Sequence, residues 1–178
     1  MRGMSLDPAK LLAEHAPDKT TLSTVQDHAV KVWHLARNMT RHMESMDYFF
    51  LYRSCLLHDM GRMIYPPGTP QAILHGIAGA KILYEEGLPG EAKVAERHIG
   101  IGISAEDVLE QGLPLPVADY VPRTPVEYVV AHADNLDGRG IRDELDVEER
   151  FATELGPRYR WRVRIFHKQV RRILDRDR

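Results

Sequence analysis

Apolar residues recur at helical intervals along most of the chain, and capping or turn residues divide it into about seven helical segments. The segment at 25–43 carries one apolar face, with side chains three or four positions apart: Val25, Ala29, Val32, Ala36, Met39 and Met43. Residues 47–61 are apolar almost all round, which predicts a buried central helix that ends at Gly61. No long alternation of β-branched residues indicates a strand. The pattern therefore predicts an all-α, single-domain helical bundle.

The expected helix starts are marked by short polar side chains followed by proline or by an acidic or amide residue. We expect N-caps at Asp7, Ser23, Ser104 and Thr124. The helix that Ser23 opens is expected to end near residue 45, and the one that Thr124 opens at the glycines of 138–140.

A non-helical crossing is predicted between Gly112 and Pro125, because four prolines fall there. The crossing is either an inert connection or a lid over a site. In the second case Tyr120 is the residue expected to contact a ring of the substrate.

Composition excludes several classes of protein. The chain has 178 residues, of which 43% are apolar and 28% charged, as in an ordinary folded domain and unlike a disordered chain. No apolar run approaches the ~20 residues that span a bilayer, and the first residues lack an apolar signal segment. We therefore expect a cytoplasmic protein with no membrane partner. Cys55, the single cysteine, lies in an apolar run and is expected to be a small buried hydrophobe.

The net charge of −2 hides an uneven distribution of charge. Residues 158–178 hold eight arginines and one lysine, and residues 143–154 hold six acids. The two stretches either face each other, or the basic one binds a polyanion such as nucleic acid. An apolar stripe through 158–178 favours a packed helix: Val163, Phe166, Val170, Ile173 and Leu174. We expect one domain over 1–157 and a basic amphipathic helix over 158–178 that packs on it.

Six ionisable residues from five segments fall on apolar helical faces: His28, His58, Asp59, His75, His98 and Asp134. A single buried histidine is usually a core residue bonded to a carbonyl group. Several buried ionisable groups need mutual pairing or a metal, and a divalent cation is the usual partner of imidazoles and carboxylates. The other five histidines are expected to be ordinary surface residues: His15, His34, His42, His132 and His167.

The order of these residues resembles that of the HD superfamily of metal-dependent phosphohydrolases. The resemblance rests on His28, on the adjacent His58 and Asp59 within LLHDMGR, and on Asp134 within VVAHADNLDG. Small HDIG-type proteins and bacterial symmetrical diadenosine-tetraphosphate hydrolases are similar in these motifs. Here methionine replaces the isoleucine of HDIG, and Arg62 stands where lysine is common. The resemblance implies an HD-type helical bundle over residues 1–157.

His75 and His98 match the additional histidines of the dinuclear branch of that superfamily. The resemblance implies one metal held by His28, His58, Asp59 and Asp134, and a second held by Asp59, His75 and His98. Asp59 would bridge the two ions and, with His58, form the catalytic centre. Iron or manganese is expected, with magnesium, nickel, cobalt or zinc as further choices.

The implied activity is hydrolysis of a phosphate ester or anhydride in a small phosphorylated substrate such as a nucleotide. A hydroxide that bridges two cations would attack the phosphorus, while the cations neutralise the charge of the transition state. Four basic residues beside the ligand positions are candidates for binding substrate phosphate: Arg62, Lys81, Arg97 and Arg139.

Two other functions remain open from the sequence. Mixed-valent diiron oxygenases that resemble HD proteins use the same six ligands in the same order, and activate O2 rather than water. The second alternative is a non-catalytic module that binds metal, and that binds RNA through the arginine-rich segment 158–178. The basic residues beside the ligands favour hydrolysis. The sequence does not indicate an oligomeric state.

Overall fold

The computed structural model describes residues 7–137 and 143–177, so Arg139 and the helix end predicted at 138–140 lie outside the described residues. The described residues form nine α-helices and two short 3-10 helices. The helices are α1 (Pro8–His15), α2 (Lys19–Thr40), α3 (Tyr48–Leu57), α4 (His75–Glu85), α5 (Pro89–Arg97), α6 (Ala105–Gln111), α7 (Pro125–Asp137), α8 (Glu144–Leu155) and α9 (Arg158–Leu174), with η1 (Met60–Met63) and η2 (Ala72–Leu74) before α4.

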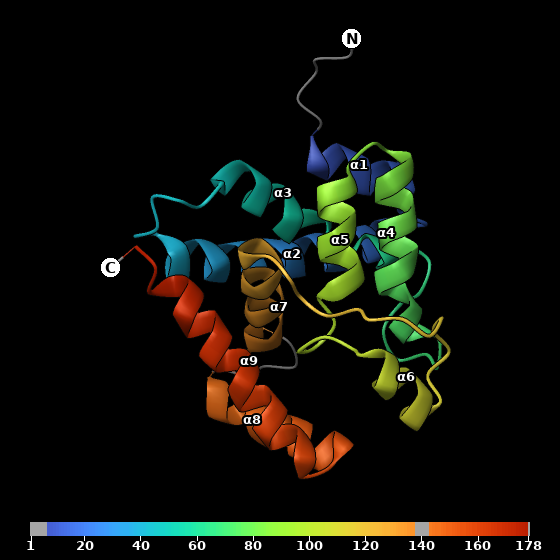
Figure 1. Ribbon diagram of the computed structural model, residues 1–178. Helices are drawn as coiled ribbons and strands as arrows, with labels where there is room; N and C mark the ends of the chain where they lie inside the picture. Colours follow the sequence, from blue (N-terminus) through green and yellow to red (C-terminus); the bar gives the residue numbers. More distant parts are fainter. Residues whose placement is uncertain (1–6, 138–142, 178) are drawn as a thin grey trace.

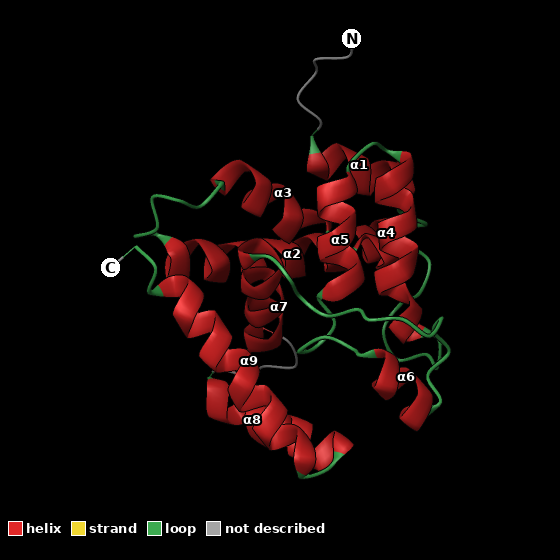
Figure 2. Cartoon of the chain, in the orientation of Figure 1, coloured by secondary structure: helices red, strands yellow, loops and turns green. Residues whose placement is uncertain are grey.

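The predicted all-α class is confirmed, and the cartoon contains helices and loops without strands in the described part of the chain (Figure 2). More helices form than the predicted number of about seven. One reason is that the acidic stretch folds as α8, whose N-cap Asp143 accepts hydrogen bonds from the backbone of Leu145 and Asp146. Asp7 and Ser104 cap α1 and α6 as predicted.

Three predicted helix boundaries are wrong. The second helix starts at Lys19 rather than at Ser23, because the Asp18 side chain accepts a hydrogen bond from Thr21 N at 2.8 Å and caps the helix one turn earlier. The same helix ends at Thr40, short of residue 45. The central helix ends at Leu57, and the chain tightens into η1 before Gly61.

Helix α2 runs through the middle of the molecule and contacts α3 and α7 (Figure 1). Its predicted apolar face is buried at Val25, Ala29, Val32 and Ala36. Helices α4 and α5 lie side by side and form a second layer, which holds η1 against α4. Helix α3 supplies buried Leu51, and Cys55 beside it is fully buried as predicted.

The pair α8–α9 stands apart from this layer, across from the short helix α6 (Figure 1). Helix α9 packs on α8 and α7 through four buried apolar residues: Val163, Phe166, Val170 and Ile173. The acidic and basic stretches face each other, since Arg164 pairs with Glu148 and Arg160 with Glu149, both at 2.8 Å. Helix α9 therefore has less unpaired positive charge than its sequence indicates.

Gly61 permits the contact that brings η1 against α4. A Cβ atom at this position would lie 1.9 Å from the carbonyl oxygen of His75 and 2.7 Å from the amide of Gly79. Both distances are shorter than any side chain tolerates, so only glycine fits between the two backbones. This contact sets the distance between the residues that precede Gly61 and the first turn of α4.

The crossing between Gly112 and Pro125 is non-helical, as predicted. Tyr120 is buried within it, pairs with Ile103 in an isolated antiparallel bridge and donates its hydroxyl hydrogen to Pro116 O at 2.9 Å. These contacts hold Tyr120 in an apolar cluster with Val108 and Leu115. The expected contact of Tyr120 with a substrate is therefore not supported.

No helix in the described ranges is both long enough and apolar enough to cross a membrane.

Candidate metal centre

Three histidines of the predicted site are held by the same local arrangement at the end of a helical segment. His58 follows α3, His75 follows η2 and His98 follows α5. Each Nδ1 donates to the carbonyl oxygen three residues earlier, at 2.7 Å in His58, 2.6 Å in His75 and 2.8 Å in His98. This bond fixes the ring and leaves Nε2 with a lone pair for a further partner.

One group of ligand atoms gathers around His28 on α2. Its Nε2 lies 2.9 Å from Asp134 Oδ1, 3.3 Å from His58 Nε2 and 3.7 Å from Asp59 Oδ2. His58 Nε2 lies 3.9 Å from the same oxygens of Asp59 and Asp134. His28, His58 and Asp134 thus place one nitrogen or oxygen each within reach of a common point.

A second group gathers around the other oxygen of Asp59. Asp59 Oδ1 lies 3.2 Å from His75 Nε2 and 3.4 Å from His98 Nε2, and these two nitrogens are 3.1 Å apart. This oxygen is buried and has no hydrogen bond of good geometry within the described ranges. The two oxygens of Asp59 therefore face two different sets of imidazoles.

Asp137, one turn after Asp134 on α7, is a site residue that the sequence reasoning missed. Its Oδ2 accepts a hydrogen bond from His28 Nδ1 at 2.9 Å, which turns Nε2 of His28 toward Asp134. A carboxylate behind a ligand histidine fixes the tautomer and raises the basicity of the ring. The sequence contained a signal for Asp137, because it lies three residues after Asp134 and residues three apart share a helical face.

The charges in the cluster suit cation binding. Burial lowers the pKa of His58 to about 4, and burial also lowers the pKa of His75. Burial opposes ionisation of Asp59, but His58, His75 and His98 outweigh it and hold the pKa of that carboxyl well below its usual range. At neutral pH, His58 and His75 are therefore neutral imidazoles beside the ionised carboxylate of Asp59, and these are the forms that bind metals.

His28 differs from the other ligand candidates. Burial lowers its pKa, but the hydrogen bond and charge of Asp134, the charge of Asp59 and the hydrogen bond of Asp137 together raise it to about 9. The surroundings of His28 thus favour a positive charge at this point. A divalent cation supplies such a charge and leaves Nε2 as a ligand.

The donor set fits divalent cations of the first transition row. Four imidazole nitrogens and two carboxylates converge from α2, α3, α4, α5 and α7, and imidazole with carboxylate suits iron, manganese and zinc alike. The buried Oδ1 of Asp59 lacks a good hydrogen-bond partner, and a cation would provide its missing interaction.

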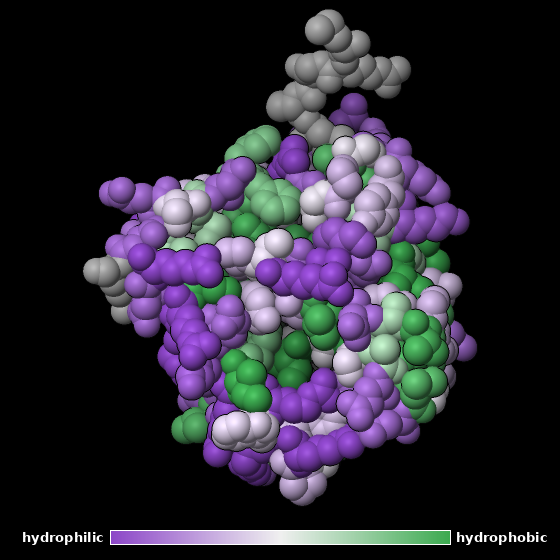
Figure 3. Space-filling view, in the orientation of Figure 1, coloured by the Kyte–Doolittle hydropathy of each residue, from purple (hydrophilic) through white to green (hydrophobic). Residues whose placement is uncertain are grey.

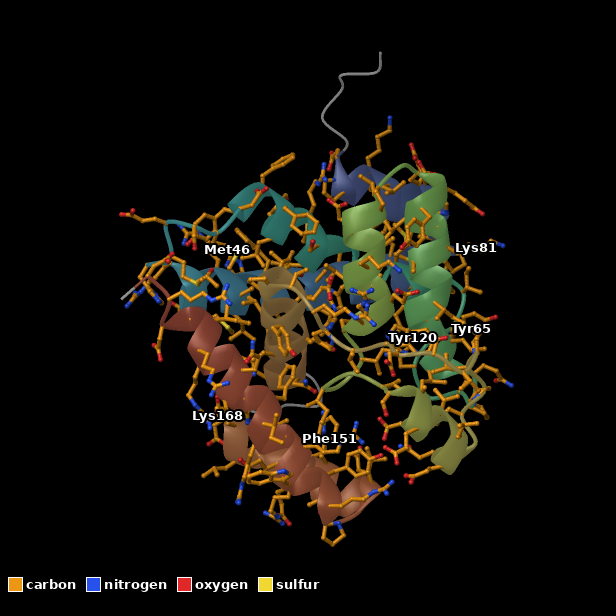
Figure 4. All side chains as sticks on the ribbon, in the orientation of Figure 1. Met46, Tyr65, Lys81, Tyr120, Phe151 and Lys168 are labelled. Carbon is orange, nitrogen blue, oxygen red and sulfur yellow. The ribbon has the colours of Figure 1, made fainter. Side chains whose placement is uncertain are left out.

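The predicted phosphate-binding residues occupy different places. Arg62 is half-buried, lines the cavity described below, and its Nε lies 3.4 Å from Asp59 Oδ1. Arg97 pairs with Glu127 at 3.1 Å and does not line the cavity. Lys81 is exposed and points away from the molecule (Figure 4). Of the described candidates, Arg62 is the one that lines the cavity.

The cluster opens into a cavity of about 900 Å³. His28, Asp59, His75, His98 and Asp134 line its inner end. The N-terminal turns of α2, the loop after His98 and helices α6 and α8 form its walls. The surface view shows a hollow bordered by both hydrophobic and hydrophilic side chains (Figure 3). This volume is near the upper end of the roughly 300–1,000 Å³ typical of small-molecule sites.

Two of the histidines expected at the surface are buried instead. His132 is 6% exposed and His167 is fully buried, and their rings meet edge to face with centroids 5.3 Å apart. The expectation was wrong for His167 because this residue directly follows Phe166 of the apolar stripe of α9. Both residues therefore lie in the interface of α9 with α7 and α8.

Comparison with known proteins identifies a family for most of the chain. A model of the HD domain matches residues 25–139. The uncharacterized protein MJ0778 of Methanocaldococcus jannaschii is 42% identical over 121 residues, which cover 67% of this chain and 63% of that protein.

Two proteins named tRNA (cytidine(56)-2'-O)-methyltransferase also match. The Thermoplasma volcanium protein is 45% identical and the Picrophilus torridus protein 48% identical, each over 82 residues. These matches cover 46% of this chain and 22% of either methyltransferase. The chain thus spans less than two thirds of the length of these relatives.

Among solved structures, the HD domain of the Listeria monocytogenes phosphodiesterase PgpH has the same fold. It superimposes with a TM-score of 0.58 at 16% identity, over 94% of this chain and 93% of that one. Its complex with cyclic-di-AMP gives a TM-score of 0.58 at 17% identity, over 96% and 94%.

Proposed function

Because this chain belongs to the HD domain family, we propose that it is a metal-dependent phosphohydrolase whose centre holds two divalent cations. The observation that carries the proposal is the placement of Asp59. Its Oδ2 faces His28 and His58, and its Oδ1 faces His75 and His98. A carboxylate with one oxygen toward each set of imidazoles is the arrangement that a bridging ligand needs.

Each candidate ligand has a proposed role at one or both of the two ions. His28, His58 and Asp134 would hold one ion, His75 and His98 the other, and Asp59 both. Bound there, the cations would activate water as a nucleophile and neutralise the charge of the phosphoryl group. The backbone carbonyls behind His58, His75 and His98 keep the imidazoles in place and leave little reorganisation for the reaction.

Arg62 is the proposed substrate-binding cation. It lies at the cavity wall beside Asp59, where a guanidinium group can bind a phosphate oxygen through two hydrogen bonds. The substrate would be a phosphate ester of an organic molecule about as large as a nucleotide, since the cavity holds far more than a phosphate group. The phosphodiesterase domain of similar fold in complex with cyclic-di-AMP supports a ligand of this chemistry.

The test is hydrolysis of p-nitrophenyl phosphate and of bis(p-nitrophenyl) phosphate by protein loaded with Mn²⁺ or Fe²⁺. We expect release of p-nitrophenolate that stops with a chelator and returns with added metal. The Asp59→Asn variant should lose this activity. Metal-loaded protein that hydrolyses neither ester would overturn the proposal.

An oxygenase with the same six ligands is the second candidate, and the apolar part of the cavity wall is the observation that favours it. An oxygenase needs an organic substrate beside an iron site, and the cavity provides apolar surface next to the candidate ligands. Oxygen uptake by iron-loaded protein in the presence of alcohols or phosphonates distinguishes it from the hydrolase.

A link to RNA is the third candidate, raised by the names of the methyltransferase relatives. The basic helix α9 is the element that would contact RNA. Much of its charge is already paired with acids of α6 and α8, through Arg158, Arg160, Arg162, Arg164 and Arg171. Salt-sensitive binding of transfer RNA, lost when arginines of α9 are replaced by glutamine, would favour this candidate.

A further inference from the structure

One wall of the cavity is apolar, and this surface begins directly beside a candidate metal ligand. The loop after His98 alternates isoleucine with glycine, and Ile99, Ile101 and Ile103 all line the cavity. Gly100 and Gly102 have positive φ values of 60° and 92°, which other residues rarely adopt. The loop therefore presents a row of apolar side chains within a few residues of His98.

Two apolar clusters meet at this wall, and each leaves part of its surface uncovered. Ile73 and Ile99 are only partly buried against the cluster of Ile103 and Val108. Ile101 is partly buried against the cluster of Phe151 and Tyr159. Figure 4 shows Phe151 on the side of α8 that faces α6. Apolar surface left open inside a cavity is typical of a binding site.

Within the described ranges, α6 and α8 bring two acidic side chains and one cation to this wall: Asp107, Glu154 and Arg150. Asp107 lines the cavity and is neutralised by Arg162, whose Nη2 donates to it at 2.7 Å. Arg150 also lines the cavity, but its Nη2 donates to Asn135 Oδ1 at 2.8 Å and its guanidinium carbon lies 4.9 Å from the Phe151 ring centroid. No lysine lines the cavity within the described ranges.

From these observations we infer that the site selects substrates with one phosphoryl group and an apolar or aromatic body. The inference rests on the proposed function and specifies its substrate class. The phosphoryl group would lie at the His/Asp cluster beside Arg62. The body would extend along Ile99, Ile101 and Ile103 toward α8. A second phosphate at the far end would lose its hydration beside the side chain of Glu154, where the guanidinium group of Arg150 already donates to Asn135 and lies over the Phe151 ring.

Binding of n-alkylphosphonates tests this substrate class without relying on turnover. Ethyl-, butyl- and hexylphosphonate carry the same charged head and differ only in the length of the body. Titration calorimetry on Mn²⁺-loaded protein should give a dissociation constant that falls roughly two- to fourfold for each buried methylene. Hexane-1,6-diphosphonate should bind roughly tenfold more weakly than hexylphosphonate, because its second charge would enter the apolar region.

A matched pair of variants on α8 tests whether the alkyl chain contacts the face of this helix that lines the cavity. Leu155 lines the cavity and is 41% exposed, so Leu155→Ser should leave the fold intact and reduce the gain per methylene. Leu145 lies on the same helix, is 70% exposed and does not line the cavity. Leu145→Ser should bind the series as the unchanged protein does.

The outcomes separate the inference from the proposed function. A gain with chain length that Leu155→Ser reduces, together with weaker binding of the diphosphonate, would support the inference. Binding of ethylphosphonate with no gain for butyl- or hexylphosphonate would overturn it and leave the hydrolase proposal standing. If metal-loaded protein binds none of the phosphonates, both are overturned.

Discussion

Two groups of buried histidines occur in this molecule, and their surroundings differ. His58, His75 and His98 each donate Nδ1 to a backbone carbonyl and direct Nε2 toward carboxylates. His132 and His167 pack against each other between α7 and α9, and neither nitrogen of His167 has a hydrogen-bond partner within the described ranges. Burial alone therefore does not identify a ligand. The distinguishing feature is a fixed ring whose free nitrogen faces a carboxylate.

The pH response of the second group follows from its surroundings. Burial lowers the pKa of His132 to about 4, with the charges of His167 and Arg171 acting in the same direction. Burial also lowers the pKa of His167, against the opposing charges of Glu144 and Glu148. This pair thus stays neutral inside the fold, and the Glu144 Oε2 atom lies 3.7 Å from His167 Nδ1, beyond hydrogen-bond distance.

The largest expected effect comes from removing the shared carboxylate of the first group. Asp59→Asn should lose bound metal and lower the hydrolytic rate by roughly 10²–10³-fold or more, because the amide cannot bridge two cations. Metal content by elemental analysis and the rate of p-nitrophenyl ester hydrolysis measure both effects. His132→Phe is the control from the second group, and it should retain metal and activity. Full metal content in Asp59→Asn would contradict the bridging role.

The second effect concerns stability in acid. Between pH 6.5 and about 4 the unfolded chain binds a proton at His132 that the folded protein does not, so the free energy of unfolding falls as the pH falls through this range. The loss should be roughly 1–3 kcal/mol. His132→Phe removes one of the histidines that titrate in this range and should make this dependence shallower in urea denaturation, while His58 still contributes. The exposed His34→Gln variant is the control, and an equal slope in all three proteins would refute the assignment.

The third effect separates a positioning residue from the ligands. Asp137→Ala removes the acceptor behind His28, and metal affinity should fall roughly 10–100-fold. Asp137→Asn keeps an oxygen that can accept this hydrogen bond and should recover part of the affinity. Competition with a fluorescent chelator measures the binding constant, and Glu106→Gln at an exposed position is the control. Unchanged affinity in Asp137→Ala would remove Asp137 from the site.

The smallest effect compares the cations beside the two groups. Arg62→Gln should raise KM for p-nitrophenyl phosphate roughly tenfold, since a charged hydrogen bond to phosphate is lost. Arg171→Gln, which breaks the pair with Glu144 near the second group, should leave KM unchanged. Equal KM values in the two variants would exclude Arg62 from substrate binding.

Much of this site could be predicted because its signals are local. A histidine at a helix end after an apolar run is readable in the sequence, and the structure brings His28, His58, Asp59, His75, His98 and Asp134 together. Their role as ligands stays a prediction. Asp137 was missed, although its spacing from Asp134 places both on one face of α7.

Other features depend on contacts between distant segments and were not readable. The start of α2 at Lys19 depends on Asp18, which competes with Ser23 as a cap, and sequence alone did not rank them. The burial of His167 depends on the packing of α9 against α7. The outer wall of the cavity combines Ile101 with Phe151, fifty residues apart in the sequence, so no local pattern marks it.

The central claim is that the first group of histidines, and not the second, binds two cations that share Asp59. Anomalous diffraction from crystals of Mn²⁺-loaded protein tests it most directly. We expect two anomalous peaks on either side of Asp59, one beside His28 and His58 and the other beside His75 and His98. A single peak, no peak at this cluster, or a peak between His132 and His167 would contradict the account.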